Sequence, residues 1–316
     1  MPGSAFSLSL FLLQAANDLL SSLADAAAAM PLALLLTLLL ARKGHALLCQ
    51  VQARLLAGLL CALTVLGPLA LLCNFLLVTQ QLTGAGVDWE LPSFFAPAML
   101  PYSSSCALWG LAALLSFLAL HLIRIRDTSE NKAPAPPPLL ALCLLLFCSI
   151  FAARFCLSWP FAGLPSGLQP AEAAGVIALH TWHQTFFGLF SAALLSLLLF
   201  PLLRRRLCAQ GCEESDGYLA HRAEALCGLV GGIPHLLNTF GTVSGYLLRS
   251  APMPQRMLEL FLQNIALLIV LVSLGLLVRK NNRHRSFLHR LALTFFFLYL
   301  LCPSICTLFV HFRVSG

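Results

Sequence analysis

Residues 258–278 read LELFLQNIALLIVLVSLGLLV, an apolar run that contains one charged residue, Glu259. A transmembrane helix needs about 20 mainly apolar residues, and leucine-rich runs of this length favour helices over the alternating strands of a membrane barrel. Similar runs recur at roughly 20–40, 55–78, 104–123, 138–158, 183–203, 224–247 and 287–310. The pattern predicts an all-α fold, a polytopic membrane helix bundle with about eight transmembrane helices.

The composition agrees with a chain that lies in lipid. Of the 316 residues, 59% are hydrophobic and 10% are charged, and the mean hydropathy is +0.87. A soluble globular chain carries about 25% charged residues. We therefore expect the lipid bilayer to be the main partner. No basic, aromatic-interleaved stretch occurs, which excludes nucleic acid. The N-terminus lacks the positive region of a secretory signal, and we expect it to be retained.

The basic residues predict the orientation of the helices. Fifteen of the nineteen lysines and arginines fall in or beside alternate connections of the predicted helices. They are Arg42, Lys43, Arg54, Arg124, Arg126, Lys132, Arg204, Arg205, Arg206, Arg222, Arg279, Lys280, Arg283, Arg285 and Arg290. Because lysine and arginine are enriched on the cytoplasmic side, these connections are predicted to be cytoplasmic. Both chain termini then lie outside.

Residues 1–316 form one predicted membrane domain, with possible halves at 1–158 and 170–316. Apolar residues also precede the first predicted span. A helix over residues 5–40 would be far longer than a membrane is thick. Asn17, Asp18 and Pro31 therefore predict an interfacial start or a kink.

The segment LHTWHQTFF, residues 179–187, is the strongest local candidate for chemistry. Pro170 and Glu172 predict a helix start upstream, with a carboxylate near the positive helix end. The spacing of three then places His180 and His183 on one helix face at the outer membrane boundary. Such a pair suits a soft or borderline metal ion or an axial haem ligand. The alternative is a pair of interfacial polar residues beside Trp182.

Other soft donors fall in the predicted outer half of the bundle. They are Met99, Cys106, Cys156, Met253, Met257, Cys302 and Cys306. Cys302 and Cys306 share one face of the last helix, and thiolate and thioether ligands favour Cu(I). The alternative for each cysteine is a small packing residue. Most of the twelve cysteines lie inside apolar runs and match no secreted disulfide scaffold.

Ionisable residues inside spans are costly in lipid and usually face a protein interior. Asp18 and Arg154 fall towards the outer side and could pair, or each could reach the interface separately. Asp25 also lies within a predicted span. His235 is predicted near the bilayer centre, either as a hydrogen-bonded core residue or as a ligand. No phosphate-binding, hydrolase or dinucleotide motif occurs, so we do not expect an enzyme.

The second half of the chain resembles the copper-resistance D (CopD/PcoD) family, eight-span proteins of the bacterial inner membrane. The resemblance is carried by HTWHQTFFGLFSAALLSLLL from residue 180, LLNTFGTVSGYLL from residue 236, and RMLELFLQNIALLIVLVSLGLLVRKNN from residue 256. It is best over residues 176–282 and looser in the first half, where SCALWGLAALLSFLALHLI begins at residue 105. The resemblance implies outward-facing copper ligands at His180 and His183.

These observations lead to a copper homeostasis or resistance protein of the inner membrane. We expect it to move copper from the periplasm towards the cytoplasm, with a periplasmic copper-binding protein as the partner that delivers the ion. His180 and His183 would capture the ion, and Cys302 and Cys306 would receive it as Cu(I). Accessory donors would be Met99, Cys106, Cys156 and His235.

Two alternatives stay open at this point. The first is a haem b-binding electron-transfer protein that uses His183 and His235, which are predicted to lie at different depths. The second is a membrane receptor or scaffold without a cofactor. An outside C-terminus counts against a seven-span receptor.

Overall fold

The computed structural model describes residues 8–40, 46–84, 100–128, 137–158, 170–209, 214–247, 254–279 and 285–315. Within these ranges the chain forms eight α-helices and no strand, which confirms the all-helical prediction. The helices are α1 (Leu8–Leu40), α2 (Ala46–Gly84), α3 (Leu100–Thr128), α4 (Pro137–Ser158), α5 (Pro170–Ala209), α6 (Glu214–Leu247), α7 (Pro254–Val278) and α8 (Arg285–Ser315). The start of α5 at Pro170 agrees with the helix start expected from Pro170 and Glu172.

Seven of the helices in the described ranges are long and apolar enough to cross a membrane. The exception is α6, which carries Gly231, Gly232, Pro234 and His235 along its length and is correspondingly less apolar. Large apolar side chains on the outer surface, among them Leu114 at 70% exposure, would be unfavourable in water and are at home in lipid. The chain therefore has the character of a multi-pass membrane protein.

The first helix differs from its prediction. α1 is continuous from Leu8 to Leu40 and runs through Asn17, Asp18 and Pro31, so the helix begins well before residue 20, where the predicted span starts. Its 33 residues are about 50 Å long at 1.5 Å per residue, which exceeds the hydrocarbon thickness. Proline is tolerated here because neighbouring groups in a membrane bundle can satisfy the backbone carbonyl that it leaves free.

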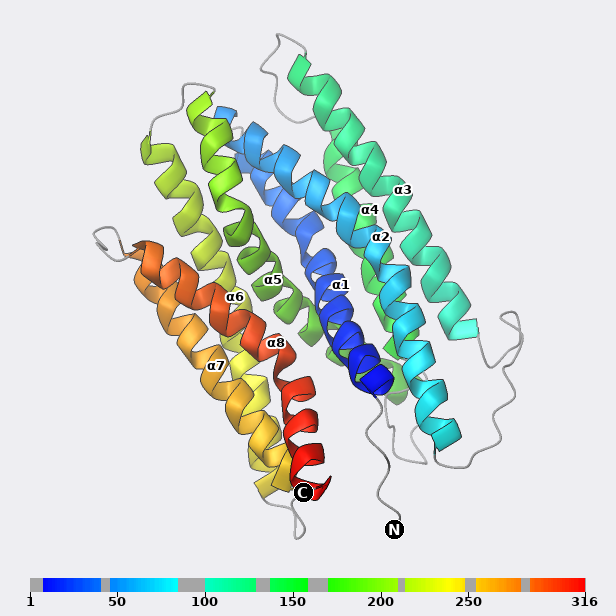
Figure 1. The fold of residues 1–316 in the computed structure, drawn as a ribbon. Coiled ribbons are helices and arrows are strands. Elements are labelled where there is room, and N and C mark those ends of the chain that lie inside the picture. The colour runs from blue at the N-terminus through cyan, green and yellow to red at the C-terminus, as the bar shows by residue number, and fades with distance from the viewer. Residues whose placement is uncertain are drawn as a thin grey trace.

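The helices form one elongated bundle in which α1–α4 and α5–α8 lie on opposite sides (Figure 1). α1 packs against α2, α4, α5 and α8, and α5 also packs against α6, so these two helices join the two groups. The start of α1 and the end of α8 lie at the same end of the bundle (Figure 1). A residue on α1 or α5 can therefore meet residues from both groups.

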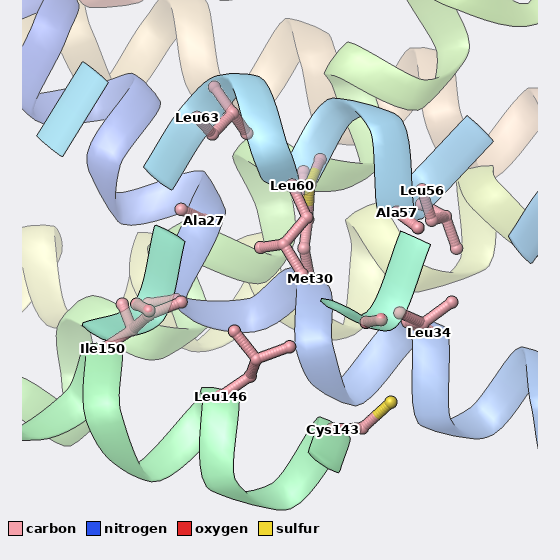
Figure 2. Packing of buried hydrophobic residues seen from close by; sticks show 14 of the residues in the cluster. Ala27, Met30, Leu34, Leu56, Ala57, Leu60, Leu63, Cys143, Leu146 and Ile150 are labelled. Atoms are coloured by element: carbon pink, nitrogen blue, oxygen red, sulfur yellow. The ribbon is translucent and has the colours of Figure 1, made fainter. Parts of the chain in front are cut away.

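Buried apolar residues gather in two clusters. In the first, side chains such as Met30 of α1, Leu60 of α2 and Leu146 of α4 pack together (Figure 2). In the second, Phe190 of α5 and Phe296 of α8 pack with residues of α6 and α7. The clusters follow the two helix groups, while the proposed division of the domain at residues 158 and 170 stays a prediction.

Candidate functional site

α5 carries both predicted histidines and meets α6 at unusually close range. A side chain added at Gly231 of α6 would lie 2.5 Å from Phe190 N and 2.6 Å from Phe186 O. Only glycine lets two helix backbones approach so closely, as is common at membrane helix interfaces. This crossing brings the histidine at the next turn of α6 against α5.

The result is a histidine pair, His183 of α5 and His235 of α6. The two rings are stacked, with centroids 5.5 Å apart and planes inclined by 21°. His183 Nε2 and His235 Nδ1 are both buried and have no hydrogen-bond partner. The expectation that these residues lie at different depths was wrong, because counting residues along each helix ignores how the helices tilt and slide at their crossing.

Tyr299 of α8 completes this group. Its hydroxyl lies 2.6 Å from His235 Nε2, and Phe187 packs on the His235 ring with centroids 4.7 Å apart. If His235 Nε2 donates to the tyrosine oxygen, Nδ1 keeps a free lone pair that can bind a metal ion. Tyr299 is buried and was not anticipated from the sequence, where a tyrosine in an aromatic-rich run carries no distinct signal.

The predicted cysteine pair lies one turn further along α8. Cys302 Sγ and Cys306 Sγ are 3.9 Å apart, and Cys302 Sγ contacts the backbone oxygen of Glu259 at 3.7 Å. Both thiols are free and buried. Two metal–thiolate bonds of about 2.3 Å span at most about 4.6 Å, so this separation fits a bent two-thiolate site.

His180 is engaged differently from His183. Arg154 of α4 donates to Gln184 Oε1 at 3.2 Å, which directs the amide nitrogen of Gln184 to His180 Nε2 at 3.0 Å. His180 Nε2 therefore accepts a hydrogen bond and lies near a guanidinium. Both features disfavour cation binding at His180, and the two histidines expected to act together take part in separate networks.

Arg154 also forms an ion pair with Asp25 of α1. Both side chains are buried, and this pair links α1 to α4 close to where Gly188 of α5 packs on the α1 backbone at Asp25. The predicted pairing of Arg154 with Asp18 is untested, because the side chain of Asp18 lies outside the described residues. Removing one partner of a buried pair leaves an uncompensated charge, so Asp25 and Arg154 depend on each other.

The remaining predicted donors are dispersed. Cys106 is half-buried and packs against the first apolar cluster, and Cys156 is half-buried on α4. Met99 and Met253 lie outside the described residues. Among the residues that the structure describes, no group of three or more histidine, cysteine, aspartate or glutamate side chains is arranged to hold a metal ion.

A second histidine pair, which the sequence did not indicate, lies at the opposite end of the bundle. His221 Nε2 of α6 is 3.2 Å from His289 Nδ1 of α8, and the rings are stacked with centroids 5.4 Å apart. The Phe200 ring of α5 covers His221 at 4.5 Å. Burial and the nearby His289 and Arg285 lower the pKa of His221 to about 4.

Comparison with family models, curated proteins and solved structures finds no match to this chain. The resemblance to the copper-resistance D family therefore stays a hypothesis. Function has to be argued from the donor groups themselves.

Proposed function

We propose that the protein is a copper-handling protein of the bacterial inner membrane, which carries copper from the periplasm towards the cytoplasm. The observation that carries this proposal is the buried thiol pair Cys302–Cys306, with sulfurs 3.9 Å apart. Two adjacent thiols in an apolar, closed environment suit Cu(I), a soft ion that accepts few ligands.

The histidine pair supports the same cargo. His183 Nε2 and His235 Nδ1 are buried nitrogens without a hydrogen-bond partner, and imidazole is a good copper ligand. Tyr299, which contacts His235, is three residues before Cys302 on α8. Residues three apart on a helix are neighbours, about 5–6 Å between Cβ atoms, so Tyr299 connects the histidine pair to the thiol pair along α8. We therefore assign copper binding to His183 and His235. His180 belongs to the Arg154 network and is not assigned as a ligand.

The proposed membrane topology has eight crossings with both termini in the periplasm. Two observations support it: the basic residues lie in alternate connections, and the start of α1 and the end of α8 lie at the same end of the bundle (Figure 1). α6, with 34 residues, is about 50 Å long and sufficient to span. In this orientation Cys306 lies towards the periplasm, because α8 begins at Arg285 on the basic side. A periplasmic copper-binding protein would deliver the ion there.

The haem b alternative has weaker support. Two axial histidines must direct their nitrogens at one iron from opposite sides of a porphyrin. Here the His183 and His235 rings are stacked nearly parallel at 5.5 Å, and His235 Nε2 is engaged by Tyr299. A Soret band in the absorption spectrum of the purified protein would favour haem over copper. A receptor or scaffold role offers no reason for two buried thiols beside a buried histidine pair.

The experiment measures Cu(I) binding to purified protein by anaerobic competition with a coloured Cu(I) chelator. We expect the double variant Cys302→Ser with Cys306→Ser to bind at least about a hundredfold more weakly, which corresponds to about 2.8 kcal/mol. The matched control is Cys61→Ser with Cys143→Ser, two buried free cysteines in the first apolar cluster region of α2 and α4. Equal affinity in both double variants would refute the proposal.

Cellular copper accumulation separates the two histidines of α5. His183→Ala is expected to reduce accumulation strongly, because it removes a buried nitrogen without a hydrogen-bond partner. His180→Ala is expected to leave it near the wild-type level, since His180 Nε2 is held by Gln184. If His180→Ala reduced copper accumulation more than His183→Ala, His180 would be the residue that captures the ion.

A further inference from the structure

A small cavity lies in the half of the bundle opposite to the thiol pair. It has a volume of about 80 Å³, which exceeds what a single water molecule needs. α1, α2, α5 and α6 all contribute to its wall, so it lies where the two helix groups meet. Its polar lining comes from Thr37, Gln52, Ser196 and Glu224, with Cys227 one turn beyond Glu224.

The lining oxygens are only partly used. Glu224 Oε1 accepts one hydrogen bond, from Gln52 Nε2 at 2.5 Å. The Thr37 hydroxyl donates to Ala33 O at 2.8 Å, which leaves the lone pairs of its oxygen free. Ser196 is 5% exposed, and its Oγ has no hydrogen-bond partner. A buried hydroxyl without a partner is unfavourable, so this cavity is built for an occupant that the oxygens can bind.

The charge of that occupant follows from the side chains around it. Among the residues that the structure describes, Glu224 is the single charged residue that lines the cavity, and those of α1, α2 and α5 contribute no titratable side chain to it. Cys227, on α6 itself, is the other titratable group in the lining. A buried carboxylate is costly unless a positive charge compensates it. One positive charge neutralises the site, whereas a divalent ion would leave one uncompensated positive charge in it.

We propose that this cavity binds one small monovalent cation, a sodium ion or a proton, on the Glu224 carboxylate. Carboxylate, hydroxyl and amide oxygens suit a hard cation, in contrast to the thiols at the other end of the bundle. Occupancy neutralises the charge of Glu224, which lies where the two helix groups meet. The site thereby offers a coupling ion for movement between these groups, and it does not depend on copper being the cargo.

The experiment follows thermal unfolding of the copper-free protein in detergent, because a ligand that binds the folded state alone raises Tm. The sodium arm titrates sodium chloride against choline chloride at constant ionic strength and pH 8. The proton arm varies pH in choline chloride alone. The variants are Glu224→Gln and Ser196→Ala, and the control is Glu214→Gln at the start of the same helix, about 15 Å before Glu224 at 1.5 Å per residue.

In the sodium arm, a saturable rise in Tm that is present in wild type and E214Q and absent in E224Q identifies sodium. In the proton arm, a change of Tm with pH that is the same in wild type and E214Q and differs in E224Q identifies a proton, because the contribution of other groups such as His221 is common to all three. Ser196→Ala is expected to raise the half-saturating concentration about threefold to tenfold, the effect of one lost oxygen contact.

Identical responses of wild type and E224Q in both arms would overturn the proposal. Should E224Q not fold, unchanged responses of S196A in both arms overturn it equally. Because neither arm contains copper, a failure here leaves the copper proposal standing, and a failure to bind Cu(I) leaves this one standing.

Discussion

At the scale of single residues, His221 is the clearest case of an ionisable group held in its neutral form. Its Nε2 lies 3.2 Å from His289 Nδ1, and the ring is buried beneath Phe200. Burial disfavours the charged ring most, and the nearby His289 and Arg285 disfavour a further positive charge, so together they lower the pKa of His221 to about 4. The histidine is therefore neutral in the folded protein near pH 7 and acquires a proton more readily when the chain unfolds.

This difference predicts a pH-dependent stability. Between about pH 6.5 and pH 4 the unfolded chain binds the proton and the folded chain does not, so stability falls as the pH is lowered through this window. Tm measured in detergent should decrease more steeply in wild type than in His221→Gln. The control is His121→Gln, since His121 is exposed on α3. Equal slopes in wild type and H221Q would show that another group governs acid unfolding.

Residue types could be predicted from the sequence, whereas their partners could not. Donor chemistry and helical spacing alone predict His183, Cys302 and Cys306 as candidate ligands. The separation of His180 from His183 depends on Gln184 and Arg154, which lie on the same and on another helix. Spacing along one helix predicts which side chains share a face, but it carries no information about what the neighbouring helix places opposite them.

At the scale of helices, the crossing of α5 and α6 positions the histidine pair. Gly231→Ala places a methyl group against Phe190 N and Phe186 O, both backbone atoms that cannot rotate away. We expect a loss of about 1–3 kcal/mol in stability, seen as a lower Tm, together with weaker Cu(I) binding as His235 shifts from His183. Gly241→Ala on the same helix is the control, because nothing lies within 4 Å of an added Cβ there.

The control is expected to be neutral or slightly stabilising, since alanine is a better helix former than glycine. A Tm for G231A equal to that of G241A would mean that α5 and α6 are further apart than described. The same comparison explains the limits of prediction at this scale. Apolar runs predict that helices exist, because each must cover about 30 Å of hydrocarbon. They do not predict how far α1 continues beyond that thickness, since helix propensity and not lipid governs its outer turns.

At the scale of the whole molecule, α6 decides the topology. Seven of the eight helices in the described ranges are long and apolar enough to cross a membrane, and α6 is the exception because of its glycines and His235. Gly231 permits the close approach to α5, Gly232 packs against Phe190 of α5 and Leu271 of α7, and His235 is hydrogen-bonded to Tyr299 of α8. A helix whose polar atoms are satisfied by its neighbours can cross a membrane despite a modest hydropathy, because lipid contacts only its remaining surface.

We therefore expect eight crossings, which fusions to a cytoplasm-active fluorescent reporter and a periplasm-active phosphatase can measure. Fusions after Ala209 and Arg279 should fluoresce, and fusions after Leu247 and Ser315 should show phosphatase activity. The fusions after Ala209 and Leu247 bracket α6 and are the decisive pair, since they report opposite sides only if this helix spans. Fluorescence of the fusion after Ser315, beside fluorescence after Leu247, would give seven crossings. Cys306 would then approach the cytoplasm, and the thiol pair would receive its ion from inside the cell.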